Sequence, residues 1–270
     1  MTATGIEQVF LRHNAGRHFV VLQYRLRKDK EVHNLFVSCF LVELAGTWFL
    51  ITAGHWLKHE ETGLERFLAD GYRIDKVFLV DAFAGHTGSP LPFSFDVADW
   101  LTIYDDADGF DFAALPVHAF HRLGLESANV SAIELRATGP AEFHADSQLA
   151  LVGVPAESFD KKGADTAMKL VLVPLTPYEG DAFPAKGDSI LAQMPINPTD
   201  AMHRVQDVAG MSGGPVFRIV TKAGKQKKYW LVGIQSGWYS TSRVVRFCPI
   251  DAFVAALKEV LEESKRIAGG

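Results

Sequence analysis

The chain has 270 residues, of which 48% are hydrophobic and 22% are charged, and its formal net charge at pH 7 is −5. This composition is that of a folded globular protein, and it excludes a disordered chain. The negative net charge argues against a nucleic-acid partner, because phosphate binding needs a basic face.

The sequence lacks the motifs of membrane, secreted and metal-binding proteins. No apolar run approaches the roughly 20 residues that span a bilayer, and the N-terminus lacks the apolar core of a signal peptide, so we expect a cytoplasmic protein with no membrane contact. Cys39 and Cys248 are expected to be free thiols. No CxxC or HExxH motif is present, and the acidic run 105–109 fails as a calcium loop because Tyr104 and Leu115 fall on its first and last ligand positions. We therefore expect no metal site.

In the first half of the chain, β-branched and aromatic residues predict a series of strands. These runs are 18–26, 35–43, 47–54, 77–84, 91–95, 100–104 and 111–116. Leu57 and Leu64 lie in a stretch of near-helical spacing, which predicts one or two helical turns after His55. Residues 118–147 are mixed in composition and rich in turn residues, which predicts a linker.

Strands resume in the second half of the chain. These runs are 147–155, 167–175, 214–220, 227–235 and 242–247. The basic cluster 222–228 lies between two of them and indicates a solvated hairpin tip rather than a binding patch. Apolar residues then recur at helical spacing and predict one amphipathic helix over 250–267. We expect an all-β fold in two domains, 1–125 and 126–270, that ends with this helix.

Small residues surround Ser212 in the segment AGMSGGP, residues 209–215. Its glycines allow positive φ angles and a close approach of a substrate to the backbone. Such a loop can present a nucleophilic hydroxyl beside backbone N–H groups that bind an anion. On its own, the segment fits a glycine turn between two strands equally well.

The order of residues along the chain tests three serine-hydrolase templates. The α/β-hydrolase elbow also matches GMSGG, but it needs a histidine after the serine, and the last of the ten histidines is His203. A subtilisin-like order needs an aspartate before the histidine, and only Asp29, in a charged surface run, precedes His55. The remaining order is met by His55, Asp111 and Ser212, each at the end of a strand-like segment.

Each of these residues also has a structural explanation when taken alone. A histidine at a strand end is usually structural, and Asp111 has the features of a strand-capping aspartate in an acidic loop. Four other histidines compete for the role of base: His59, His118, His121 and His203. None of them follows an apolar strand and a small turn as His55 does.

The local sequences resemble those of chymotrypsin-like (trypsin-like) serine peptidases. WFLITAGH, residues 48–55, resembles the strand and turn that carry the catalytic histidine of that family, and DFAALPV, 111–117, resembles its aspartate-bearing strand. GMSGGP, 210–215, resembles its nucleophile loop. LVGIQSG, 231–237, is similar to the strand that lines the substrate cleft, and VGVP, 152–155, is similar to the opening of the second barrel.

The resemblance covers roughly residues 35–265 and implies a fold and a set of roles. The fold is two antiparallel six-stranded β-barrels with the active site between them, followed by a C-terminal α-helix. Ser212 would be the nucleophile, His55 the general base and then acid, and Asp111 the group that orients the imidazole. The oxyanion hole would be formed by the backbone N–H groups of Gly210 and Ser212.

The resemblance also implies where substrate binds. Ser236 and Gly237 would pair with the substrate backbone as an added strand. Gln206 would lie at the base of the primary specificity pocket, which favours a small or polar side chain at the cleavage site. If the loop is shifted by one residue, Asp207 would instead favour a basic one, and Trp238 would narrow the pocket.

Two departures from the family bear on control of the activity. Met211 stands where zymogen-activated members carry an acid that pairs with a freshly cleaved N-terminus. Trp56 follows His55, so the disulfide beside the catalytic histidine is missing. The resemblance is therefore to bacterial or intracellular members, without a signal peptide or a PDZ domain.

These patterns lead to one hypothesis and two alternatives. The hypothesis is a cytoplasmic serine endopeptidase that cleaves protein or peptide substrates through an acyl-enzyme, without a cofactor. The first alternative is a catalytically silent pseudoprotease that acts as a peptide-binding or regulatory module. The second is a peptidase that stays inactive until an activating protein partner orders its loops.

Overall fold

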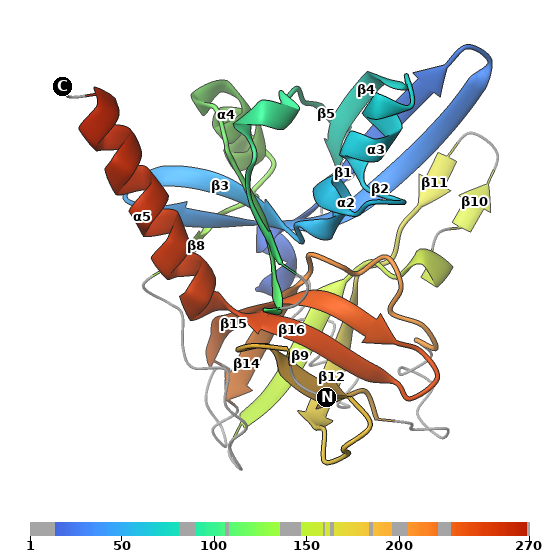
Figure 1. The fold of residues 1–270 in the computed structure, drawn as a ribbon, viewed down its shortest axis with the longest axis vertical. Coiled ribbons are helices and arrows are strands. Elements are labelled where there is room, and N and C mark those ends of the chain that lie inside the picture. The colour runs from blue at the N-terminus through green and yellow to red at the C-terminus, as the bar shows by residue number, and fades with distance from the viewer. Residues whose placement is uncertain are drawn as a thin grey trace.

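The computed structural model describes residues 14–80, 90–105, 108–135, 147–158, 160–162, 165–183, 186–195, 205–220 and 228–268. The chain forms an N-terminal sheet and a C-terminal barrel, with a long helix beside both (Figure 1). Several of the sequence features above lie wholly or partly outside the described residues: residues 81–84 of the predicted strand 77–84, residues 136–146 of the predicted linker, His203, and the basic cluster 222–228 apart from Lys228.

The N-terminal sheet has eight strands, where the sequence predicted a six-stranded barrel. The strands are β1 (Phe19–Lys28), β2 (Glu31–Leu44), β3 (Thr47–Thr52), β4 (Arg73–Val80), β5 (Leu91–Pro92), β6 (Leu101–Asp105), β7 (Phe110–Pro116) and β8 (Ile133–Glu134). Their order is β5-β4-β1-β2-β3-β7-β6, and β8 pairs with β2 in parallel. Within the described residues no pairing between β5 and β6 closes the sheet.

The C-terminal half forms a closed six-stranded antiparallel barrel, as predicted. Its strands, in the order in which they pair, are β12 (Val171–Pro177), β13 (Ile190–Gln193), β16 (Val244–Pro249), β15 (Lys228–Tyr239), β14 (Pro215–Val220) and β9 (Ser147–Gly153). Two short strands, β10 (Asp160–Lys162) and β11 (Asp165–Ala167), pair only with each other. The fold is therefore all-β: an eight-stranded sheet forms the first half, and a closed barrel with a small two-stranded sheet forms the second.

Helices occur between the strands and at the C-terminal end. They are η1 (Ala15–His18), α2 (His55–Lys58), α3 (Leu64–Ala69), η2 (Val97–Asp99), α4 (Ala119–Ser127), η4 (Ala156–Ser158) and α5 (Ile250–Ala268). The helical turns predicted after His55 are confirmed as α2 and α3. The prediction of a linker over 118–147 is wrong at its start, because α4 lies there.

Helix α4 has nine residues and buries one of them, so no buried face reveals it in the sequence. Leu125 is its buried residue, whereas Phe120 and Leu123 are 71% and 66% exposed. The helix begins where the His118 side chain accepts a hydrogen bond from the Phe120 N–H, and Arg122 pairs with a glutamate one turn later. A cap and a surface ion pair thus stabilise a helix whose apolar residues are mostly exposed.

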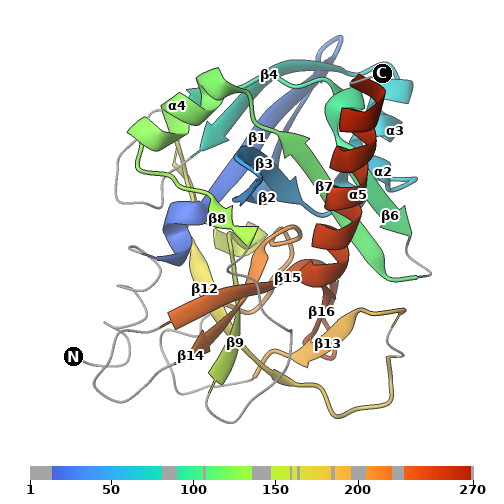
Figure 2. The same cartoon turned by 90° about the vertical axis from the view of Figure 1, so that its left-hand side faces the viewer.

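Helix α5 confirms the predicted C-terminal helix and connects the two halves. Ile250, Phe253 and Leu257 are buried in an apolar cluster that also contains residues of the N-terminal sheet. The ring centroid of Phe253 lies 5.4 Å from that of Phe112 on β7. In Figure 2 α5 crosses in front of β7, the strand that also carries Asp111.

None of the helices in the described part of the chain is both long enough and apolar enough to cross a membrane.

Candidate active site

His55 and Asp111 are joined by two hydrogen bonds. The Nδ1–H of His55 donates to Oδ2 of Asp111 at 2.7 Å, and the backbone N–H of His55 donates to Oδ1 at 2.8 Å. Asp111 is 1% exposed, and the His55 side chain is 28% exposed. A carboxylate only accepts hydrogen bonds, so the proton of the neutral ring lies on Nδ1, and the lone pair of Nε2 can accept another proton. This is the tautomer that a general base requires.

Gly54 brings His55 close to the strand that carries Asp111. Strand β3 ends at Thr52, and it pairs with β7, of which Asp111 is the second residue. A Cβ atom at Gly54 would lie 2.8 Å from the carbonyl oxygen of Phe112, closer than real Cβ contacts allow. The absence of a side chain at this position therefore permits both hydrogen bonds to the carboxylate.

Ser212 lies in a turn that rests on the end of β3. It is half buried, and Gly213 after it has a φ of 87°, which favours glycine. A Cβ atom at Gly213 would lie 2.1 Å from Oγ1 of Thr52 and 2.8 Å from the backbone nitrogen of Ala53. The turn thus contacts the backbone just before His55.

The hydrogen bond between nucleophile and base is not formed. Within the described residues the His55 ring hydrogen-bonds to Asp111 alone. Such contacts are often long before a substrate binds. The structure therefore brings together the His55–Asp111 pair and the serine turn, with the third contact open.

The two predicted oxyanion donors have no other partner among the described residues. Neither the N–H of Gly210 nor that of Ser212 donates a hydrogen bond there. Gly210 is exposed and has a φ of 87°, and Met211 between them is fully buried. Two N–H groups that flank an anchored residue are therefore free to bind an anion.

The predicted substrate-binding strand is bulged and open on one side. The register of β15 on β16 shifts between Gln235 and Gly237, which leaves Ser236 as an extra residue. The carbonyl oxygen of Gly237 accepts from the side-chain amide of Gln235 at 3.0 Å. Strand β14 pairs with β15 as far as Ile234, and the N–H of Gly213 and the carbonyl oxygen of Gly214 bond to Gln235, so the open edge begins beyond Gln235. Trp238, also beyond that point, is half buried against the barrel interior. Another strand can be added to the open edge.

Gln206 and Asp207 are both engaged by neighbouring groups. The backbone N–H of Gln206 donates to Glu157 at 2.7 Å, and its carbonyl oxygen accepts from Arg243 at 3.0 Å. The side chain of Gln206 is exposed. Oδ1 of Asp207 accepts from the N–H of Ala209 at 2.8 Å. These bonds hold the segment that precedes the serine turn.

The competing histidines have other roles. His59 accepts hydrogen bonds from the N–H groups of its own loop, and His118 caps α4. Burial lowers the pKa of His121, with neighbouring His118 adding to the effect, and its ring packs 4.6 Å from that of Phe93. Within the described residues none of the three pairs with a carboxylate, as His55 does.

Two residues beside the site have no distinctive sequence pattern. The Ser38 hydroxyl donates to the carbonyl oxygen of Gly210 at 3.0 Å. The Cys248 thiol donates to the carbonyl oxygen of Gly109 at 2.8 Å. Burial raises the pKa of Cys248 to about 11, and the charge of nearby Asp111 also raises it. Both contacts depend on the packing of the two halves, which no local motif encodes.

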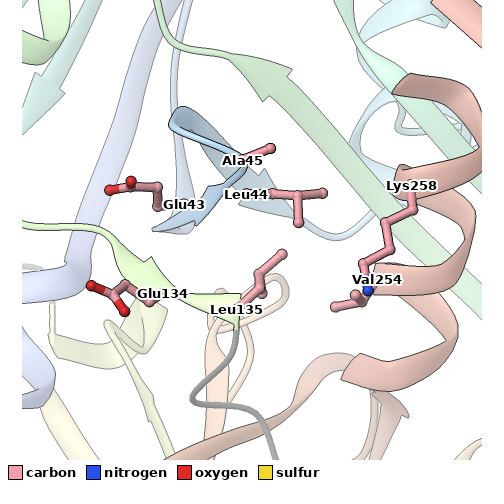
Figure 3. A pocket seen from close by; sticks show the side chains of 7 residues that line it. All are labelled: Glu43, Leu44, Ala45, Glu134, Leu135, Val254 and Lys258. Atoms are coloured by element: carbon pink, nitrogen blue, oxygen red, sulfur yellow. The ribbon is translucent and has the colours of Figure 1, made fainter. Parts of the chain in front are cut away.

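A separate pocket of about 490 Å³ lies between the turn after β2, β8 and α5. It is lined by Glu43, Leu44, Ala45, Glu134, Leu135, Val254 and Lys258. Figure 3 shows Glu43 and Glu134 on one side and the two α5 residues on the other. None of the predicted site residues lines it. In the described part of the chain no three His, Cys, Asp or Glu side chains are grouped closely enough to hold a metal ion.

No protein-family model matches the chain, and no curated protein matches it either. Solved structures of similar shape include a thermostable serine protease, AL20, from an extremophilic microorganism, with 12% identity over 87% of this chain and 91% of that one and a TM-score of 0.45. Protease Anisep from Arthrobacter nicotinovorans shows 15% identity over 86% and 90% of the two chains, also with a TM-score of 0.45. A catalytically inactive tobacco etch virus protease in complex with substrate shows 11% identity over 87% and 78%, with a TM-score of 0.42. At these values the similarities assign no activity to this chain.

Proposed function

We propose that this chain is a serine endopeptidase of the trypsin-like type, which cleaves peptide bonds through an acyl-enzyme. The observation that carries the proposal is the double hydrogen bond between His55 and buried Asp111. An aspartate that fixes both the backbone and the ring of one histidine selects the tautomer that can take a proton from a serine. The turn that holds Ser212 lies against the residues just before that histidine.

In the proposed reaction Ser212 Oγ attacks the carbonyl carbon of the substrate while Nε2 of His55 takes its proton. The negative charge that develops on the carbonyl oxygen is bound by the N–H groups of Gly210 and Ser212. His55 then gives the proton to the leaving amine, and water hydrolyses the acyl-enzyme by the same steps. Asp111 stays ionised and stabilises the imidazolium.

We propose that the substrate backbone binds along the open edge of β15. A bulge at Ser236 turns the peptide groups of this strand relative to β16, and β-strand addition satisfies unpaired backbone groups. Gln206 would contact the side chain at the cleavage site. Asp207 already accepts a hydrogen bond from the Ala209 N–H. This supports a preference for a small or polar substrate side chain at the cleavage site over a basic one.

Several finer expectations belong to the same proposal. They are a closed N-terminal barrel, domain limits at 1–125 and 126–270, a bacterial or intracellular type, a cytoplasmic location, and the absence of a nucleic-acid partner. The net charge of −5 supports the last of these. Control by an activating protein partner would fit a peptidase whose Met211 cannot pair with a new N-terminus.

A second function is favoured by one observation. The His55 ring does not bond to Ser212 in the described residues, as expected if the site only binds peptides. Such a pseudoprotease would use the edge of β15 without chemistry.

A fluorophosphonate probe distinguishes the two functions, because it labels only an activated serine. We expect the purified chain to be labelled, Ser212→Ala to give no labelling, and His55→Ala to be labelled far more slowly. Ser127→Ala on α4 is the matched control and should be labelled like the wild type. A folded wild-type chain that stays unlabelled from pH 6 to pH 9 would contradict an enzyme that is active without a partner and favour the binding module.

A further inference from the structure

Ser38 lies on β2, in the N-terminal sheet, and contacts the serine turn of the C-terminal half. It is 2% exposed, and its hydroxyl donates to the carbonyl oxygen of Gly210 at 3.0 Å. The Ser38 carbonyl oxygen accepts from Oγ1 of Thr52 at 2.9 Å. The hydroxyl is thus held on a strand that is itself fixed to β3.

The same residue also contacts the turn on the other side of Ser212. A Cβ atom at Gly213 would lie 2.5 Å from the carbonyl oxygen of Ser38. The turn therefore contacts Ser38 on both sides of Ser212: Gly210 accepts its hydrogen bond, and Gly213 lies close to its carbonyl oxygen.

Three successive peptide groups carry the two oxyanion donors and the link between them. The Ala209 carbonyl oxygen accepts from the N–H of Ala156 at 2.7 Å, and the Met211 carbonyl oxygen accepts from the N–H of Gly214 at 2.8 Å. In a trans peptide the N–H points opposite to the carbonyl. These two bonds therefore set the directions of the N–H groups of Gly210 and Ser212.

The peptide group between the donors has two hydrogen bonds: its N–H, from Met211, donates to the carbonyl oxygen of Val208 at 3.0 Å, and its carbonyl oxygen accepts from Ser38. Its carbonyl belongs to Gly210, which has the widest backbone freedom of any residue and sits at a φ of 87°. Among the described residues the Ser38 hydroxyl is the hydrogen-bond partner of that carbonyl. Without this bond the peptide group would be held only by the bond from Met211 to Val208 within the turn, and it would lose its hydrogen bond to the N-terminal sheet.

We propose that Ser38 is a positioning residue that keeps the N–H groups of Gly210 and Ser212 aimed at one point. This inference rests on the proposed peptidase function. The anion site is formed by backbone N–H groups of the C-terminal half. In this inference a residue on a strand of the N-terminal sheet keeps those groups aligned.

The test compares rates of fluorophosphonate labelling for the wild type, Ser38→Ala, Ser38→Thr and Ser127→Ala. We expect Ser38→Ala to be labelled about 10-fold more slowly, a smaller loss than the ~10²–10³-fold cost of deleting an oxyanion donor. Ser38→Thr, which keeps the hydroxyl, should recover most of the rate. Ser127→Ala, which removes another hydroxyl-to-carbonyl bond on α4, should match the wild type.

The pH profile separates positioning from a loss of packing. We expect Ser38→Ala to lower the plateau of the labelling rate and to leave the midpoint of its pH profile unchanged, because His55 and Asp111 are unaltered. The Tm of Ser38→Ala should match that of Ser127→Ala. Labelling of Ser38→Ala within twofold of the wild type would overturn the role of Ser38 and leave the proposed function intact. The role of Ser38 would also be overturned if Ser38→Ala were labelled slowly and its Tm were lower than that of Ser127→Ala. A wild type that is not labelled would contradict the proposed function and this role together.

Discussion

Gly153 on β9 leaves the space that the Met211 side chain fills. A Cβ atom at Gly153 would lie 2.9 Å from Cε of Met211 and 3.1 Å from its Cβ. Met211 is fully buried in the apolar interior of the barrel. The residue next to Ser212 is thus anchored by apolar packing, for which the flexible methionine side chain is well suited.

A charge at this position should not be tolerated. We expect Met211→Asp to lower the free energy of unfolding by about 3 kcal/mol or more, because a carboxylate would be buried without a described partner. Met211→Leu should cost less than about 1.5 kcal/mol. Urea unfolding of both variants measures the difference, and equal stability of the two would show that the side chain can reach solvent.

Replacing Asp111 should slow the chemistry without unfolding the chain. In the wild type both the backbone N–H and the Nδ1–H of His55 donate to the Asp111 carboxylate. In Asp111→Asn one carboxylate oxygen is replaced by an NH2 group, so one of these two donors would face another donor. We expect the rate of probe labelling to fall by about 10⁴-fold, as the wrong ring tautomer is then favoured. Asp99→Asn, at an exposed position, is the control. A loss below about tenfold in Asp111→Asn would remove Asp111 from the proposed mechanism.

Buried His18 should make stability depend on pH. It contacts the carbonyl oxygen of Ser131 at 2.7 Å and the hydroxyl of Tyr229 at 2.9 Å, and burial lowers its pKa from 6.5 to about 4. Because the folded-state pKa lies below the unfolded value, the unfolded chain binds a proton that the native chain does not. The stabilisation is present above pH 6.5 and is lost as the pH falls towards 4.

We expect the free energy of unfolding of the wild type to fall between pH 7 and pH 4 by about 3 kcal/mol more than that of His18→Gln. Urea titrations at several pH values measure this. His33→Gln, at an exposed position, should follow the wild-type curve. Parallel curves for the wild type and His18→Gln would mean that His18 is protonated in the native protein.

Both cysteines should resist thiol reagents in the native state. Cys39 and Cys248 are buried free thiols, and burial raises the pKa of Cys39 to about 12 and that of Cys248 to about 11. The thiolate is the reactive form, so little of it is present near pH 8. We expect slow reaction with a disulfide reagent at pH 8 and rapid reaction of both thiols in denaturant. A fast native reaction of one thiol would show that its surroundings open readily.

Patterns of local sequence were sufficient to predict much of this architecture. Alternating and β-branched runs predicted strands at β1, β2, β3 and β7, and helical periodicity predicted α5. The pairing of His55 with Asp111 was anticipated from chain order and local context, and the structure brings the two side chains together. These features are encoded within short segments, which is why they could be predicted.

Features that depend on contacts between distant segments could not be predicted. The bond from Ser38 to Gly210 joins residues far apart in the chain, and the contact of His18 with Tyr229 spans an even longer separation. The eight-stranded N-terminal sheet includes β8, whose two residues carry no clear periodicity. Helix α4 buries one of its nine residues. In each case the stabilising contact belongs to the tertiary structure and not to the segment.

The contact between Phe253 of α5 and Phe112 of β7 has a consequence for biosynthesis. Phe112 adjoins Asp111, and the helix that packs against it is made after every strand of both halves. A chain still on the ribosome therefore holds its proposed nucleophile, base and aspartate before the aspartate-bearing strand has its neighbour. Because α5 completes that packing, the strand that carries Asp111 reaches its full set of contacts only once α5 has been made.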